Sequence, residues 1–94
     1  GDITLNSSTH IVTVRGENKL LPNKEFQLLE FLMINADIVF SRETIYNRIW
    51  GMESFGSTST VPVHINRTRD AIEKDPANPQ HILTIWGVGY KFRP

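Results

Sequence analysis

The chain has 94 residues, of which 39% are hydrophobic, and it contains no cysteine. Ten lysines and arginines balance ten aspartates and glutamates, so the formal net charge is zero with the three histidines neutral. This length supports one modest hydrophobic core, and the lack of cysteine excludes disulfides, thiolate metal sites and a cysteine nucleophile. Without an apolar run of about 20 residues or a signal-like start, we expect one cytoplasmic domain over residues 1–94 and no membrane contact.

The first twenty residues alternate short β-prone runs with turn residues. Residues 3–5 and 11–14 are rich in Ile, Val, Thr and Leu, and residues 6–8 between them are Asn and Ser. Residues 15–18 provide a second turn before Leu20. This pattern predicts a small antiparallel sheet within residues 1–21.

A central core helix is predicted from Pro22 to about residue 35. Proline is tolerated in a first turn because its missing N–H would have no intrahelical partner there. The apolar residues that follow cover a broad arc of a helix, namely Phe26, Leu28, Leu29, Leu32 and Met33. Leu21 stands where Ser, Thr or Asp would cap the free amides, so the start should be weakly held or capped by another group.

Ser41 is a good N-cap for a second helix over residues 42–50. Ile45 and Ile49 lie on its inner side, and Gly51 is suited to end it in the αL conformation. Residues 51–57 include two glycines and Phe55, so the connection to the next helix is longer than in a simple helix-turn-helix. Loops of this kind often carry contacts.

A third helix is predicted to begin near Ser59, with Pro62 in its first turn, and to end by Asp75. Its inner stripe is Val61, Ile65 and Ile72, with Thr68 interrupting it. Its outward residues are Val63, Asn66, Arg67, Asp70 and Lys74. Such a face suits a DNA major groove, where Asn can pair with adenine, Arg with guanine, and Val can touch a thymine methyl.

Residues 82–85 and 90–92 are predicted strands around the turn at 86–89. A terminal hairpin after three helices is typical of a wing. The predicted fold is therefore α+β, a winged helix-turn-helix with an N-terminal antiparallel sheet (1–21), three helices (22–74) and a C-terminal β-hairpin wing (82–93). In that fold the third helix enters the major groove and the wing meets the minor groove or phosphates.

The neutral charge limits how DNA could be bound. A nonspecific nucleic-acid binder is usually strongly basic, so contacts here must be local, through a few arginines, helix N-termini and backbone amides. The few basic residues on the third helix leave an alternative open, a winged-helix protein–protein interaction module with little DNA affinity.

An enzyme is not expected. His10, His64 and His81 fall in separate segments without metal-ligand spacing, so we expect no metal and no cofactor. The chain also lacks a glycine-rich phosphate loop and a G-x-S-x-G elbow. Catalysis therefore has no candidate site.

Four segments, in this order, resemble the C-terminal effector domains of OmpR/PhoB-type response regulators: KEFQLLEFL, SRETIYNRIWG, TVPVHINRTRDAIE and ILTIWGVGYKF. The resemblance implies a two-component regulator that binds double-stranded DNA sequence-specifically and controls transcription. It also implies a receiver domain that a histidine kinase phosphorylates, homodimerisation through that receiver, binding to direct repeats and contact with RNA polymerase. Because Gly1 begins directly at a strand-like segment, we expect a domain excised from a longer receiver-containing protein.

The resemblance assigns roles to individual residues. Asn66 and Arg67 would read bases and Val63 would touch a thymine, whereas Arg69 would contact a phosphate or a partner. Thr84 and Lys91 would hold the DNA backbone near the wing. All DNA-contact candidates are Val63, Asn66, Arg67, Arg69, Asp70, Arg42, Ser59, Thr60, Thr84, Trp86 and Lys91. The polymerase-contact candidates are Trp50, Glu53, Ser54, Phe55 and Gly56.

The chain departs from the family pattern at several positions. Ser59 stands where a basic residue usually opens the third helix, and Pro62 where an acidic residue is usual. Asp70 replaces a common basic residue. Many members have an arginine that reaches into the minor groove where this chain has Trp86, and we expect that indole to pack within the hairpin rather than wedge against a sugar.

Four aromatic or imidazole side chains near these candidates are expected to pack rather than contact DNA. His64 lies at the edge of the inner stripe of the third helix. Tyr46 and Trp50 are expected in the core, and Tyr90 between the wing and the third helix.

Overall fold

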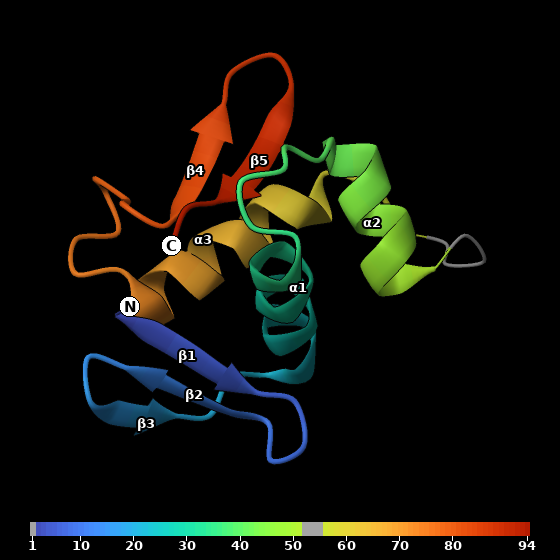
Figure 1. Ribbon diagram of the computed structural model, residues 1–94. Coiled ribbons are helices and arrows are strands. Elements are labelled where there is room, and N and C mark those ends of the chain that lie inside the picture. Colours follow the sequence, from blue (N-terminus) through green and yellow to red (C-terminus); the bar gives the residue numbers. More distant parts are fainter. Residues whose placement is uncertain (1, 52–55) are drawn as a thin grey trace.

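The computed structural model describes residues 2–51 and 56–94. Its elements are β1 (Ile3–Asn6), β2 (Ile11–Val14), β3 (Glu17–Lys19), α1 (Asn23–Ile34), α2 (Arg42–Trp50), α3 (Thr60–Ile72), β4 (Ile82–Ile85) and β5 (Gly89–Phe92). Three helices lie between the β1–β3 sheet and the β4–β5 hairpin (Figure 1). The predicted winged helix is confirmed. No helix within the described residues has the length and apolar character needed to cross a membrane.

The N-terminal sheet has the order β1-β2-β3 and is antiparallel. Alternation along its strands turns Ile3, Val12 and Val14 into the core. The third strand differs from expectation, because pairing begins at Glu17 and Leu20 is left 82% exposed. The reason is the short turn, in which Arg15 (φ 46°) and Gly16 (φ 85°) both adopt positive φ, as a two-residue hairpin requires.

The core lies where α1 meets α3, α2 and β5. α1 begins one residue later than predicted, with Pro22 rather than Leu21 at the N-cap, and no side chain caps its start, as the sequence indicated. The fully buried side chains include Phe26, Leu28, Leu29, Leu32, Ile45, Val61, Ile65, Ile72 and Ile82. One apolar cluster thus joins the sheet, all three helices and the wing.

α2 begins as predicted, because the Oγ of Ser41 accepts a hydrogen bond from the Thr44 N–H at 3.1 Å. Its end differs in detail. Gly51 has φ 85° and ψ 152°, so it uses the positive φ open to glycine but does not adopt the αL conformation. The backbone N–H of Gly51 still closes the helix on the carbonyl of Asn47.

Substitution of Ser41 by alanine should lower the free energy of unfolding by about 1 kcal/mol, because the Thr44 N–H loses its cap. Urea denaturation monitored by circular dichroism measures this loss. Ser8→Ala, in an exposed turn, is the matched control and should change little. Equal losses in the two variants would show that the cap does not stabilise α2.

Thr68 does not interrupt the inner stripe of α3 as the sequence suggested. It is fully buried together with Val61, Ile65 and Ile72. Its hydroxyl donates to the carbonyl of His64 at 2.8 Å, one helical turn back. That bond satisfies the buried hydroxyl and lets threonine occupy an apolar position.

The wing is attached to the segment that precedes α2. β4 and β5 pair in register from Ile82 with Phe92 to Ile85 with Gly89, so β5 starts one residue earlier than predicted. Phe40 and Tyr90 exchange two backbone hydrogen bonds of 2.9 Å. This bridge holds β5 of the wing beside the N-terminus of α2.

Candidate nucleic-acid interface

The outer face of α3 presents the side chains that the sequence singled out. Val63 is 47% exposed, the side chain of Arg67 is 62% exposed, and Asn66 and Asp70 are also exposed. These residues lie opposite the buried stripe, because a helix separates its two faces at 100° per residue. The side chains with the most specific base chemistry therefore face solvent on a regular helix.

A buried carboxylate lies beneath this face. Glu25 of α1 is 4% exposed, and one of its oxygens lies 3.0 Å from Nδ1 of His64 and 3.9 Å from Nη1 of Arg67. His64 also packs edge-on against Trp50, with ring centroids 4.9 Å apart. His64 is thus a packed residue, as expected. Glu25 contacts Arg67 from the buried side, while most of the Arg67 side chain stays in solvent.

Arg69 lies between α3 and the wing rather than projecting outward. Its Nε and Nη2 donate to the carbonyl of Ile82 at 3.0 and 2.9 Å, and Nη2 donates to Oγ1 of Thr84 at 2.8 Å. The guanidinium carbon lies 6.0 Å from the centre of the Tyr90 ring. Tyr90 is half-buried here, which agrees with its expected place between wing and α3.

Burial lowers the pKa of Arg69, and the charges of Tyr90 and Glu73 oppose that shift. An arginine remains cationic in spite of it. The sequence suggested a phosphate or partner contact for this residue. In the structure most of its donors already serve the wing, so Arg69 joins the candidate DNA-reading helix to the hairpin beside it.

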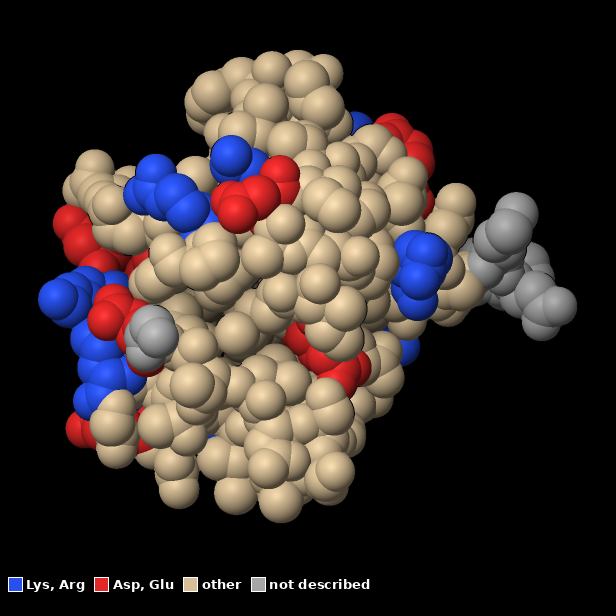
Figure 2. All heavy atoms as spheres, viewed as in Figure 1, with Lys and Arg blue, Asp and Glu red and all other residues tan. Residues whose placement is uncertain are grey.

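The tip of the wing is apolar and exposed. Trp86 is 89% exposed and Val88 is 58% exposed. The expectation that Trp86 packs within the hairpin is wrong. Strand pairing ends at Ile85, and Gly87 (φ 79°) turns the chain directly after the indole, which therefore extends past the last paired residues. Figure 2 shows the hairpin tip, at the top of the view, without any charged residue.

Two grooves flank the wing. The larger, of about 560 Å³, lies between α3 and the wing, and Asn66, Arg69, Thr84 and Trp86 are among its lining residues. The other, of about 380 Å³, lies between the N-terminus of α2 and the wing, and Arg42 contributes to it together with Thr84 and Trp86. The fold thus brings candidates from α2, α3 and the wing to two adjoining hollows.

The remaining DNA-contact candidates are more scattered. Ser59 is exposed and Thr60 half-buried at the start of α3. Ser59 makes no side-chain cap there, since its hydroxyl bonds to that of Ser57. Lys91 lies on β5 opposite Leu83 and is half-buried.

The polymerase-contact candidates are only partly within the described residues. Trp50 is half-buried and stacks on Tyr46 with ring centroids 5.6 Å apart, which agrees with an expected packing role. Gly56 is exposed, and its N–H donates to the Tyr46 hydroxyl at 2.9 Å. The other three candidates, Glu53, Ser54 and Phe55, lie outside the described residues.

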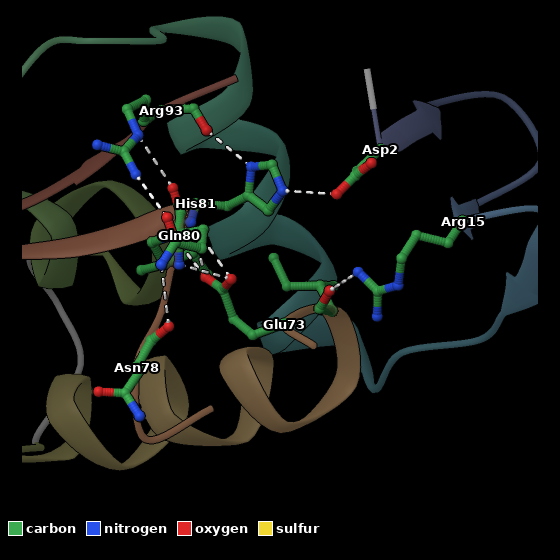
Figure 3. A network of polar contacts seen from close by, with 9 residues as sticks. Asp2, Arg15, Glu73, Asn78, Gln80, His81 and Arg93 are labelled. Atoms are coloured by element: carbon green, nitrogen blue, oxygen red, sulfur yellow. Dashed lines mark hydrogen bonds and ion pairs between the residues drawn. The ribbon is translucent and has the colours of Figure 1, made fainter. Parts of the chain in front are cut away.

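Sequence reasoning missed two buried acids that organise this region. Glu73, 5% exposed after the last turn of α3, accepts hydrogen bonds from the N–H groups of Gln80, His81 and Ile82 at 2.8–3.0 Å (Figure 3). An acid at a helix C-terminus is unfavourable for the helix dipole, which was a signal that it serves another purpose. Glu25 was detectable too, because it precedes Leu28, Leu29 and Leu32 at helical spacing on the apolar arc.

The chain matches the family described as "Transcriptional regulatory protein, C terminal" over residues 16–92. It is 46% identical over 91 residues to the sensory transduction protein RegX3 of Mycolicibacterium smegmatis, covering 97% of this chain and 40% of that protein. The crystal structure of DrrB, an OmpR/PhoB homologue from Thermotoga maritima, superposes with a TM-score of 0.92 at 41% identity, covering 100% of this chain and 42% of DrrB. The DNA-binding domain of Klebsiella pneumoniae RstA in complex with the RstA box gives 0.88 at 27% identity, covering 99% and 92%.

The fold and its exposed helix define a winged-helix DNA-binding domain of a transcription regulator. The chain belongs to the C-terminal DNA-binding domains of OmpR/PhoB-type response regulators. This family acts in two-component signalling and is not a class of enzymes. The chain spans about two-fifths of the length of the curated relative it matches, so the properties of a whole regulator remain proposals here.

Proposed function

We propose that this chain recognises a specific DNA sequence with α3 in the major groove and the wing at the minor groove or the backbone. The observation that carries the proposal is the exposed row of Val63, Asn66 and Arg67 on α3. Glu25 of α1 contacts this helix, and Arg69 joins it to the wing. A B-DNA major groove admits one α-helix, and each base pair presents a distinct pattern of donors and acceptors there.

Arg67 is the principal base reader in this proposal. Its side chain is 62% exposed, and its contact with Glu25 is long at 3.9 Å. The planar fork can therefore reach the O6 and N7 acceptors of guanine. Val63, one turn earlier, would contact a thymine methyl, and Asp70, one turn later, would accept a bond from a cytosine amino group.

The DNA backbone would be held from both sides of the helix. Arg42 at the start of α2, and Ser59 and Thr60 at the start of α3, lie at helix N-termini, which favour phosphates. Thr84 and Lys91 would contact phosphates beside the wing. The exposed, uncharged Trp86 has no arginine chemistry for a narrow A·T groove, so its contact with DNA would be apolar, against sugars or base edges.

The roles of the whole regulator are proposed from its relatives. RegX3 is named a sensory transduction protein, and the RstA domain was solved on its DNA box. By analogy, a histidine kinase would phosphorylate a receiver domain, and two chains would bind adjacent direct repeats and contact RNA polymerase. A second, protein-binding function of the same helix is the competing possibility, which the neutral net charge favours.

Arg67→Ala should weaken binding to the preferred duplex by about 1 to 3 kcal/mol and relax specificity at one base pair. The loss arises because a guanine would lose its bidentate partner. Selection of bound duplexes from a random pool gives the preferred site. Fluorescence anisotropy over a salt series then measures the affinity of the wild type and of the variant for that site.

Arg67→Lys is the matched control, because it keeps the positive charge but lacks the planar guanidinium that can donate to two acceptors at once. It should retain the salt dependence and lose the base preference. Lys74→Ala, at an exposed residue beyond the end of α3, should leave specificity unchanged. If Arg67→Ala binds like wild type at low and moderate salt, Arg67 is not a base reader, and if no duplex is selected at all, the protein-binding alternative is favoured.

A further inference from the structure

The amide of Asn66 has a neighbour that restricts which base it can recognise. Nη1 of Arg69, three residues further along α3, donates to Oδ1 of Asn66 over 3.4 Å. Residues three apart lie on the same side of a helix, so this contact is local to the exposed face of α3. The Asn66 side chain and Arg69 also line the same groove beside the wing.

The chemistry of the pair determines the orientation of the amide. A guanidinium carries five N–H donors and no acceptor, whereas an amide has one end that donates and one that accepts. Rotation of the amide by 180° would place its NH₂ group against an N–H of Arg69. The arrangement with the carbonyl toward Arg69 and the NH₂ group away from it is therefore the favoured one.

The guanidinium that holds this amide is itself held. Three hydrogen bonds join Arg69 to Ile82 and Thr84 of β4, and its guanidinium lies over the Tyr90 ring. Arg69 cannot follow a rotation of the Asn66 amide without breaking bonds to the wing. The wing therefore determines, through Arg69, which end of the Asn66 amide faces solvent.

We propose that Asn66 acts as a hydrogen-bond donor only and recognises a base whose major-groove edge carries acceptors and no amino group, guanine or thymine. Arg69 is the positioning residue for this choice. This inference rests on the proposed DNA-reading function. The usual pairing of Asn with adenine needs both ends of the amide, the carbonyl to accept from N6 and the NH₂ group to donate to N7. Here the carbonyl is turned toward Arg69 and the NH₂ group away from it, so the 6-amino group of adenine would face an amide donor.

The first test uses the wild-type chain and modified DNA. Asn66→Ala identifies, by selection from a random pool, the base pair whose preference depends on this side chain. At that base pair the wild type should bind duplexes with guanine or thymine about 5- to 10-fold more tightly than those with adenine. This factor is at the lower end of the discrimination that one base contact provides. Replacing adenine there by purine, which lacks the 6-amino group, should not weaken binding and should tighten it.

The second test uses variants. Arg69→Ala frees the amide, so the base preference at the position that depends on Asn66 should shift toward adenine. The preference at the position that depends on Arg67 should persist. Persistence of the Arg67 preference shows that α3 is still docked as before. Arg67→Ala is the reciprocal control and should leave the Asn66 preference intact.

The outcomes separate this inference from the proposed function. A wild-type preference for adenine at the Asn66 pair, with at least a 5-fold loss on purine, would overturn the donor-only role while leaving sequence-specific binding in place. No change of base preference in Asn66→Ala would overturn it as well. Absence of any preferred duplex for the wild type would instead remove the proposed function and, with it, the inference.

Discussion

Replacing Glu73 by alanine is expected to lower the free energy of unfolding by about 3 kcal/mol, because a buried acceptor that serves three backbone donors is lost. The carboxylate accepts from Gln80 at 2.9 Å, His81 at 3.0 Å and Ile82 at 2.8 Å. Ile82 is fully buried, so water cannot readily replace the carboxylate at its N–H. Urea denaturation measures the loss, and amide exchange at Ile82 should become faster.

Two controls separate this effect from a general loss of charge. Glu73→Gln keeps one acceptor but places an NH₂ group against the backbone donors, so its loss should be intermediate. Glu17→Ala removes an exposed glutamate from β3 and should change the free energy by at most about 0.5 kcal/mol. If Glu73→Ala were as mild as Glu17→Ala, the segment before β4 would not depend on this carboxylate.

Gly89→Ala is expected to cost about 3 kcal/mol or more, because it overpacks a site where the neighbouring atoms belong to the backbone. A Cβ at Gly89 would overlap the carbonyl of Phe40 and lie 2.9 Å from the Cα of Ser41. These atoms belong to the segment that bridges to Tyr90, so relief requires the wing to move away from the N-terminus of α2. Urea denaturation and affinity for the selected duplex should both decline.

The wing offers a matched control for this substitution. Gly87 has φ 79° and open space around its missing Cβ, so Gly87→Ala should cost only about 1 kcal/mol through backbone strain. Equal losses for the two glycines would show that the close approach at Gly89 does not fix the wing.

Local chemistry explains why much of the fold could be predicted from the sequence. The cap at Ser41, the stripe of Val61, Ile65 and Ile72, and the turn around Gly87 depend on residues within one or two helical turns or one hairpin. The exposure of Asn66 and Arg67 followed from the same period of α3. Prediction became less accurate where a tight turn decided the register, as at Arg15 and Gly16, whose positive φ angles start the third strand at Glu17 and leave Leu20 outside it.

The sequence by itself determined the order of elements, the winged-helix class and the face of α3 that meets solvent, because helical period, capping and turn residues act over short distances along the chain. Only the tertiary structure decided what the charged and aromatic side chains do. Glu25 meets His64 across 39 positions and Arg69 meets Ile82 across 13, so their roles depend on how the helices and wing pack. The exposure of Trp86 was decided in the same way, since it depends on where strand pairing ends and on the tip being left uncovered by the elements within residues 2–51 and 56–94.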